Sequence, residues 1–338
     1  MTIPASLIIP CCNPGNNLQN LTDNIKSWSQ LPQEILLIDS SSKAVLIDSA
    51  FTAFCDIHGV SIELLRFQKL YPGKARNLGI KNAKHSVVAF VDILTLPSPD
   101  WLEEGFESIQ ASSCAGIWGN TLYKANNRFE KLIRACTFGI KGIKTLPGLI
   151  VKKSIFDISG LFIESTRAGE DTDWMHRVAL HDIQLQDSSQ TLTYVGLKDI
   201  TLIALVQKWY RNYVFSANLP YLTPHKDIYF YCSAIFFIVL AFNWNNLSYD
   251  SNLNGWNINT ISYLPNVTKL SILFFASLYA VTRGVIIPYK KGVSLQYIGL
   301  NFLPILAISM ILDITKLFAF FTSTVFSALK IKNYYSSK

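Results

Sequence analysis

The stretch Tyr71–Leu102, YPGKARNLGIKNAKHSVVAFVDILTLPSPDWL, predicts a glycine turn, a short basic helix, a strand and an acid at the strand's end. Lys74 and Arg76 make the helix cationic. Ser86–Val91 is an unbroken apolar run of strand length, of the kind buried on both faces of a parallel sheet. Asp92 follows at the carboxyl end of that strand, where open α/β sheets bind their ligands. Cations beside one carboxylate at this edge predict a site for a phosphorylated ligand.

The residues before this stretch repeat the alternation of strand and helix. The expected segments are, in chain order, strand Ala5–Pro10, helix 17–30, strand Glu34–Asp39, helix 51–58 and strand Ser61–Phe67. A β-α-β-α-β-α-β order predicts a mostly parallel sheet with helices on both faces, and Asp39 then lies at the same edge as Asp92. Because neither a glycine-rich dinucleotide fingerprint nor a Walker loop follows the first strand, we expect carboxylates and cations to hold a nucleotide.

A second acidic centre lies at Gly169–Trp174. Glu170, Asp171 and Asp173 crowd there at the start of a predicted helix. A helix dipole favours one or two acids in the first turn, so an N-terminal capping cluster is the structural alternative. Crowding raises the proton affinity of some of these carboxylates, and a carboxylate with raised proton affinity suits a general base.

The chain becomes much more apolar after about Lys226. Half of all residues are hydrophobic (50%), and the mean hydropathy of +0.26 is high for a soluble enzyme. Ile228–Trp244, Leu270–Ile287 and Leu300–Phe321 approach the ~20 residues that a helix needs to span hydrocarbon. Charges interrupt the third run, which is therefore either a span or a broken or re-entrant element.

Those charges also suggest a pairing and a topology. Asp313 in the third run is an expected partner for Arg283 in the second, since charges inside membranes usually pair. The connection 245–269 has almost no Lys or Arg, whereas Lys290 and Lys291 separate the second and third runs. The positive-inside rule then predicts that the catalytic domain lies in the cytosol. We expect an integral protein of the plasma (inner) membrane.

Leu202–Leu219 predicts a basic amphipathic helix, in which Lys208 and Arg211 stand among aromatic residues. Such a helix belongs at a membrane surface, and a peripheral helix packed on the catalytic domain is the alternative. The expected organisation is a catalytic domain at 1–198, an interface helix at 199–225 and a transmembrane region with two to three spans at 226–338. No nucleic-acid partner is expected, because the net charge of +7 does not gather in one basic patch.

Five segments fall in the order and spacing of family 2 glycosyltransferases of the GT-A fold, and together they cover roughly residues 5–180: SLIIPCCNPGNNL, EILLIDSSS, YPGKARNLGI, VVAFVDILTLPSPDWLE and AGEDTDWMHRV. The resemblance implies an α/β domain of the GT-A type. It also implies that a membrane-anchored, inverting enzyme transfers one sugar from a nucleotide sugar, with a UDP-sugar expected, to a membrane-borne acceptor. A lipid-linked saccharide or a growing glycan of the cell envelope would fit that acceptor.

The resemblance also assigns roles to single residues. It makes Asp171 the general base and gives Glu170 the task of orienting the acceptor or the base loop. The implied donor contacts are Pro10, Asn13, Asp39, Gly73, Lys74, Arg76, Asn77 and Asp92. The implied acceptor contacts are Trp118, Gly119 and Trp174, with Lys208 and Arg211 at the diphosphate or at the membrane interface. For Trp118 the alternative is a place in the core, because an aromatic residue in a strand is usually buried.

The sequence departs from the family at its metal-binding motif. The family's DxD holds a divalent metal, Mg²⁺ or Mn²⁺, but here the motif reads Asp92-Ile93-Leu94, and leucine cannot ligate either ion. Three consequences are open. Asp92 holds a metal with other groups, or Lys74 and Arg76 with later cations carry the diphosphate charge, or the protein is an inactive membrane scaffold.

A second departure concerns processivity. Gln207, Trp209 and Arg211 do not form the Gln-x-x-Arg-Trp motif of processive relatives, so we expect one sugar per transfer event. The alternative within the same chemistry is a synthase that charges a polyprenyl phosphate with one sugar.

Overall fold

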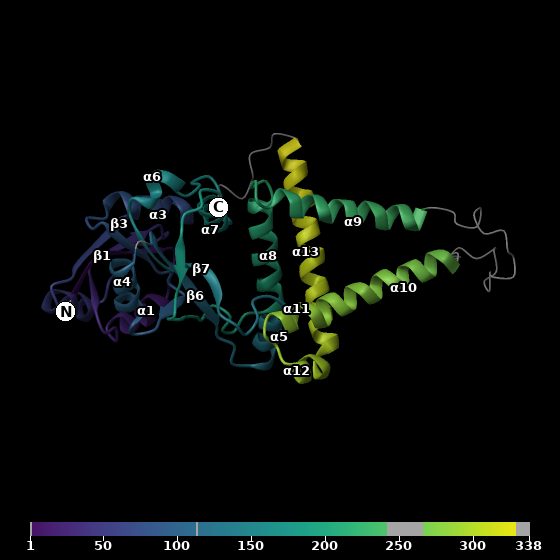
Figure 1. The fold of residues 1–338 in the computed structure, drawn as a ribbon, viewed down its shortest axis with the longest axis horizontal. Coiled ribbons are helices and arrows are strands. Elements are labelled where there is room, and N and C mark those ends of the chain that lie inside the picture. The colour runs from purple at the N-terminus through teal and green to yellow at the C-terminus, as the bar shows by residue number, and fades with distance from the viewer. Residues whose placement is uncertain (1, 113, 242–265, 329–338) are drawn as a thin grey trace.

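The computed structural model describes residues 2–112, 114–241 and 266–328, with an α/β domain at one end and helices at the other (Figure 1). The domain is built on one mixed sheet of strand order β3-β2-β1-β4-β7-β6-β9-β5, in which β8 also pairs with β6. Most of its strand pairs are parallel, and β7 pairs antiparallel with β4 and β6. The predicted α/β domain with a mostly parallel sheet, followed by a helical region, is confirmed.

The strands are β1 (Thr2–Cys11), β2 (Leu31–Asp39), β3 (Ser61–Arg66), β4 (Val87–Phe90), β5 (Thr95–Pro97), β6 (Gly116–Tyr123), β7 (Ile143–Lys152), β8 (Leu185–Asp187) and β9 (Leu192–Tyr194). The helices of the domain are α1 (Asn17–Ile25), α2 (Ser49–Ile57), α3 (Pro72–Asn82), α4 (Trp101–Ala111), α5 (Arg128–Cys136), α6 (Ile155–Ser159) and α7 (Glu170–Leu180). After them come α8 (Leu202–Ser216), α9 (Thr223–Ala241), α10 (Asn266–Val281), the π-helical turn η3 (Thr282–Ile286), α11 (Ile287–Lys290), α12 (Leu295–Leu300) and α13 (Phe302–Ala328).

The parallel strands align their carboxyl ends at one edge of the sheet. β1 pairs with β2 and β4, and Cys11 at the end of β1 lies opposite Asp39 at the end of β2. All four residues of β4 are buried, as its unbroken apolar run predicts. The turns that follow β1 and β4 therefore meet at this edge, and Asp92 is placed there.

Helices cover both faces of the sheet because side chains alternate along each strand. Leu7 and Ile9 of β1 pack in one core with α1, α2 and α4, whereas Ile8 packs in the other with α3, α6 and α7. Gly79 lets α3 approach the sheet closely, since a Cβ at this position would collide with the side chain of Ile8. Arg76 on the same helix is thereby held close to the strand ends.

In the helical part, α8 and α13 lie side by side, and α9 and α10 run outward from them (Figure 1). Leu270–Lys290 and Phe302–Ser327 are long and apolar enough to cross a membrane, so both fit a membrane region. The first predicted run is described as far as Ala241, within α9, and the remainder up to Trp244 lies outside the described residues. The predicted pairing is confirmed, with Arg283 Nε 2.6 Å from Asp313 Oδ2.

Candidate active site

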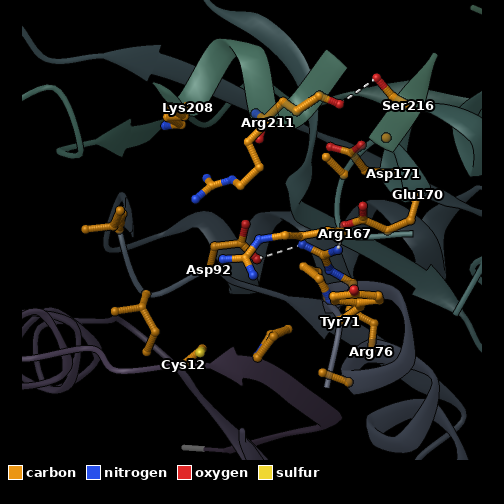
Figure 2. Close-up of a pocket in the computed structure, with 18 of the residues that line it drawn as sticks. Cys12, Tyr71, Arg76, Asp92, Arg167, Glu170, Asp171, Lys208, Arg211 and Ser216 are labelled. Carbon is orange, nitrogen blue, oxygen red and sulfur yellow. Dashed lines mark hydrogen bonds and ion pairs between the residues drawn. The ribbon is translucent and has the colours of Figure 1, made fainter. Parts of the chain in front are cut away.

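A cavity of about 890 Å³ opens between the carboxyl ends of the parallel strands and α8 (Figure 2). It is lined by the turn after β1, the turn after β4, and residues of α3, α7 and α8. The predicted site residues in this lining are Pro10, Asn13, Arg76, Asp92, Glu170, Asp171, Lys208 and Arg211. Segments more than a hundred residues apart in sequence thus contribute to one site.

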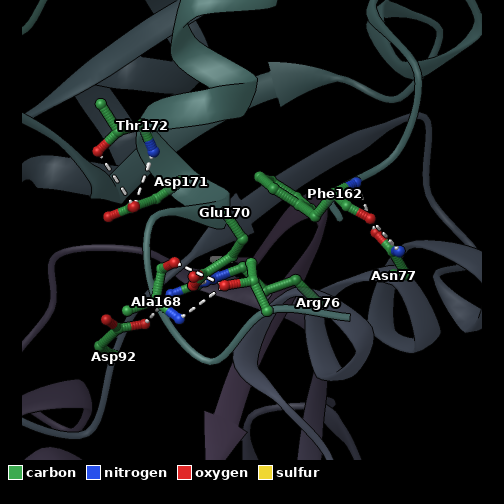
Figure 3. A network of polar contacts seen from close by, with 9 residues as sticks. Arg76, Asn77, Asp92, Phe162, Ala168, Glu170, Asp171 and Thr172 are labelled. Atoms are coloured by element: carbon green, nitrogen blue, oxygen red, sulfur yellow. Dashed lines mark hydrogen bonds and ion pairs between the residues drawn. The ribbon is translucent and has the colours of Figure 1, made fainter. Parts of the chain in front are cut away.

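Arg76 joins the two acidic centres (Figure 3). Its Nη2 lies 3.0 Å from Asp92 Oδ1, and its Nη1 lies 2.7 Å from Glu170 Oε1. Burial lowers the pKa of Arg76, but Asp92, Glu170 and Asp171 together raise it above its ordinary value, so the guanidinium stays charged. One buried cation therefore ties α3 to the end of β4 and to the start of α7.

Glu170 begins α7 and is almost completely buried, with 4% of its surface exposed. Burial raises the pKa of Glu170 to about 7, and the neighbouring Asp171 adds to this, although Arg76 opposes it. Near neutral pH this carboxyl is therefore poised between its two protonation states.

Asp171 lines the cavity one residue further along the chain. Its Oδ1 accepts a 2.7 Å hydrogen bond from the backbone N–H of Thr172, and the Thr172 hydroxyl lies 3.3 Å away (Figure 3). A carboxylate that faces the cavity, and whose position is fixed by its own helix, can accept a proton from a bound ligand.

Cations line the cavity opposite these acids. Arg167 and Arg211 extend toward the space beside Asp92 (Figure 2), and Lys208 of α8 also lines the cavity. Burial lowers the pKa of Arg211, and the nearby charge of Arg167 lowers it further. Within the described ranges neither guanidinium forms an ion pair, and the buried Nε of Arg211 has no hydrogen-bond partner there. Because these guanidiniums converge without an ion-pair partner, this side of the cavity is a suitable place for a phosphate group.

Aromatic residues form a further part of the lining. Tyr123 stacks on Phe138 with ring centroids 3.7 Å apart and lies 4.8 Å from the ring of Tyr194. Trp209 of α8 completes this aromatic group, 6.2 Å from Phe138. None of these four aromatic residues was predicted from the sequence as a site residue, and neither was Arg167. Arg167 left one signal, a basic residue three positions before Glu170, whereas the aromatic residues come from separate elements.

Asp39 lies at the predicted sheet edge but does not line the cavity. Its side chain is fully buried and accepts hydrogen bonds from the backbone N–H groups of Ser41 and Val45. Burial alone would raise the pKa of Asp39, but these hydrogen bonds and nearby Arg66 bring it below its ordinary value. In this structure Asp39 holds the 41–45 turn in place beside the cavity.

Three predicted donor contacts on α3 also lie away from the cavity lining. The Nζ of Lys74 is 3.8 Å from a carboxylate oxygen of Glu164. Asn77 donates to the carbonyl of Phe162 and accepts from its backbone N–H, each at 2.9 Å. A Cβ on Gly73 would collide with the carbonyl of Ile163. In this structure these residues fasten the 162–164 loop to α3.

The structure places the predicted acceptor residues in the core. Trp118 and Trp174 are buried, with ring centroids 6.0 Å apart, and Trp174 donates from Nε1 to Ser159. Gly119 sits where a Cβ would collide with the carbonyl of Pro147. None of the three lines the cavity, so the core alternative named for Trp118 describes its position.

The donor set does not fit a divalent metal. Across residues 2–112, 114–241 and 266–328, no group of three His, Cys, Asp or Glu side chains could hold a metal ion. Asp92 is already paired with Arg76, and Leu94 offers no oxygen ligand.

Comparison with known proteins finds a family similarity over part of the chain. The model described as Glycosyl transferase family 2 matches residues 6–162. This range contains Arg76 and Asp92 but ends before the second acidic centre. The glycosyltransferase AglE of Haloferax volcanii is 22% identical over 205 residues, which cover 57% of this chain and 65% of AglE.

Solved structures show a more distant similarity. A crystal structure of S. aureus TarS 1-349 is 13% identical and superposes with a TM-score of 0.41, covering 98% of this chain and 93% of that one. The same protein in complex with UDP-GlcNAc is also 13% identical, with a TM-score of 0.40 over 97% of this chain and 92% of that one.

Proposed function

We propose that the protein is an inverting glycosyltransferase, on the premise that residues 6–162 match the model described as Glycosyl transferase family 2. It moves one sugar from a nucleotide-sugar donor to a membrane-associated acceptor. The observation that carries the proposal is the meeting of Arg76, Asp92, Glu170 and Asp171 at one cavity. A volume of about 890 Å³ has room for such a donor.

In the proposed reaction Asp171 is the general base. It takes the proton of an acceptor hydroxyl while the hydroxyl oxygen attacks the anomeric carbon of the donor sugar. The bond from that carbon to the diphosphate oxygen breaks, and the nucleoside diphosphate leaves with the electron pair. One base without a covalent nucleophile inverts the configuration at the anomeric carbon.

Cations of the chain offset the charge of the leaving diphosphate. Arg167, Lys208 and Arg211 surround the space beside Asp92, and a bound diphosphate would supply the anion that the two guanidiniums lack. The nucleoside, for which a uridine is expected, lies along the turn Pro10–Asn13. No step needs a divalent metal, in keeping with the donor set at Asp92.

The acceptor side is proposed to be the aromatic group of Tyr123, Phe138, Tyr194 and Trp209, whose rings can pack against a sugar. Two apolar helices support attachment to a membrane, so a lipid-linked saccharide or a surface glycan is the proposed acceptor. The proposal retains a catalytic domain at 1–198, an interface helix at 199–225 and a plasma-membrane region at 226–338, with the catalytic domain in the cytosol.

A polyprenyl-phosphate sugar synthase is the second candidate. The observation that favours it is the set of cations Arg167, Lys208 and Arg211 in the cavity lining, of which the last two belong to α8. An anionic acceptor would need these cations and would need Asp171 less. Alanine substitutions of Lys208 and Arg211 would then abolish turnover, while Asp171→Asn would leave it intact.

The decisive experiment compares the wild-type protein with Asp171→Asn in donor hydrolysis and sugar transfer. Loss of a general base is expected to lower turnover ~10²- to 10⁴-fold. The thermal shift produced by the donor should remain, because Asn keeps the shape of the site. Both assays are run with Mn²⁺ and with a chelator, and equal activity is expected in each.

Asp157→Asn is the matched control, since Asp157 is an exposed acid on α6 outside the cavity. It should change neither turnover nor the donor shift. A purified wild-type protein that neither hydrolyses nor transfers any nucleotide sugar would favour the inactive scaffold.

A further inference from the structure

α13 and the pair α9–α10 differ in direction although all three are strongly apolar. α9 and α10 run outward, across the direction of α8 and α13 (Figure 1). α9 has 19 residues and α10 with η3 and α11 reaches from Asn266 to Lys290, so each is near the length that crosses ~30 Å of hydrocarbon. Helices that run in such different directions cannot all be perpendicular to one membrane.

The contacts of α13 bear on its orientation relative to the membrane. Near its start, the carbonyl of Ile305 accepts a hydrogen bond from Cys136 of α5. Near its end, Thr322 bonds to Tyr210 of α8, and Ser323 accepts from Asn218. These contacts extend over 18 residues, or about 27 Å of helix. α13 is therefore fastened along its length to the part of the chain that forms the cavity.

Charged groups on α5 and α8 exclude an orientation of α13 perpendicular to the membrane. Arg128 and Lys131 are exposed on α5, and Lys208 and Arg211 of α8 line the cavity. If α13 crossed the membrane, these cations would lie at hydrocarbon depth, where an unpaired charge is strongly unfavourable. The polar cavity itself would also open into lipid tails.

The exposed face of α13 is nevertheless apolar. Leu303, Met310, Ile314, Phe318 and Phe321 form one stripe by helical spacing, and each is 46–72% exposed. The opposite face is buried and includes Ile305, Leu312 and Phe320. A helix with one face packed on protein and an apolar face outside is suited to lie in a membrane surface.

We propose that α9 and α10 are the described helices that cross the bilayer, and that α13 lies in the plane of its surface with this stripe in contact with lipid. We assign the bilayer as the contact of the stripe because α10 also exposes large apolar side chains, such as Leu273 and Leu278. Lys226 at the start of α9 and exposed Lys290 at the end of α11 stand where anionic headgroups would lie. The inference rests on the proposed membrane attachment, and it places the mouth of the cavity at headgroup level.

The test is a depth measurement on the full chain in anionic phospholipid vesicles. Single cysteines replace Leu303, Met310, Ile314 and Phe321 of α13, and Leu270, Leu273, Leu278 and Val281 of α10. The background carries Cys12→Ser and Cys232→Ser, which remove the two exposed native thiols. A nitroxide on each cysteine reports depth through its collision rates with oxygen and with a water-soluble nickel chelate.

The four α13 positions are expected to share one shallow depth, while depth along α10 changes steadily by about 16 Å over 11 residues. A profile in which Met310 and Ile314 lie about 10 Å deeper than Leu303 and Phe321 would overturn the in-plane assignment and leave the proposed enzyme standing. If all eight positions were aqueous, the membrane attachment itself would fail together with the inference.

The eight positions are exposed or partly exposed, so the substitutions should be tolerated by the fold. Lys290→Ala is a second, independent check that introduces no label. It should weaken attachment of the protein to anionic vesicles relative to neutral ones. Unchanged binding to both kinds of vesicle would count against the placement of Lys290 at the lipid headgroups.

Discussion

Glu170 is the buried carboxyl of the site, and its raised pKa predicts how the stability of the protein changes with pH. The folded value of about 7 lies above the ordinary 4.5. Between these pH values the folded protein holds a proton that the unfolded chain has released. The contribution of Glu170 to the free energy of unfolding is therefore fully present below pH 4.5 and is lost as pH rises through 7.

Glu170→Gln removes this titration. The difference in unfolding free energy between variant and wild type should change by about 3 kcal/mol between the two ends of that window. Denaturant unfolding at a series of pH values in detergent measures it. Glu164→Gln, a change at a half-exposed carboxylate, should follow the wild-type profile. Parallel profiles for wild type and Glu170→Gln would show that the carboxyl titrates normally.

At the scale of elements, Arg76 connects α3, the end of β4 and the start of α7. Arg76→Ala leaves Glu170 buried without its cation, and the expected loss of stability is about 3–5 kcal/mol. Combining it with Glu170→Gln should cost less than the two single changes added together, by about 0.5–3 kcal/mol. Thermal or denaturant unfolding of the four proteins gives this coupling.

The matched control lies two residues away on the same helix. Lys74 pairs with Glu164 at 3.8 Å, and both side chains are about half exposed. Lys74→Ala should change the unfolding free energy by less than about 1 kcal/mol. If the Arg76 and Glu170 effects were simply additive, α3 and α7 would not be joined through this ion pair.

At the scale of the whole molecule, Asp313 fastens the outward helices to α13. It accepts hydrogen bonds from Tyr229 of α9 at 3.0 Å and from Tyr279 of α10 at 2.9 Å, and it pairs with Arg283. Asp313→Asn keeps the size of the side chain but leaves the guanidinium without its carboxylate. The expected loss of stability is about 3 kcal/mol.

Intrinsic-fluorescence melting in detergent micelles measures that loss. Adding Arg283→Met to Asp313→Asn should restore part of the stability, because the uncompensated charge is removed. Equal melting temperatures for wild type and Asp313→Asn would mean that α9 and α10 are held against α13 by packing alone.

Local patterns determined much of the architecture and some of the site. The apolar run Ser86–Val91 and the repeated strands before it gave the parallel strands, because burial on both faces requires such runs. The acids at strand ends and at the start of α7 located Asp92 and Asp171, since parallel strands end at one edge. The pairing of Arg283 with Asp313 followed from the cost of a lone charge in lipid.

Tertiary packing alone decided the rest. From the sequence, Trp118 and Trp174 could equally be residues on which a sugar stacks, but the helices packed over the sheet bury them. The aromatic residues that line the cavity instead are Tyr123, Phe138 and Trp209. Arg167 acquires its place only when the segment before α7 folds back beside α8. The direction of α13 depends on contacts with α5 and α8 that are over a hundred residues away in sequence. Hydropathy measures how apolar a helix is, but only long-range contacts fix which way it points.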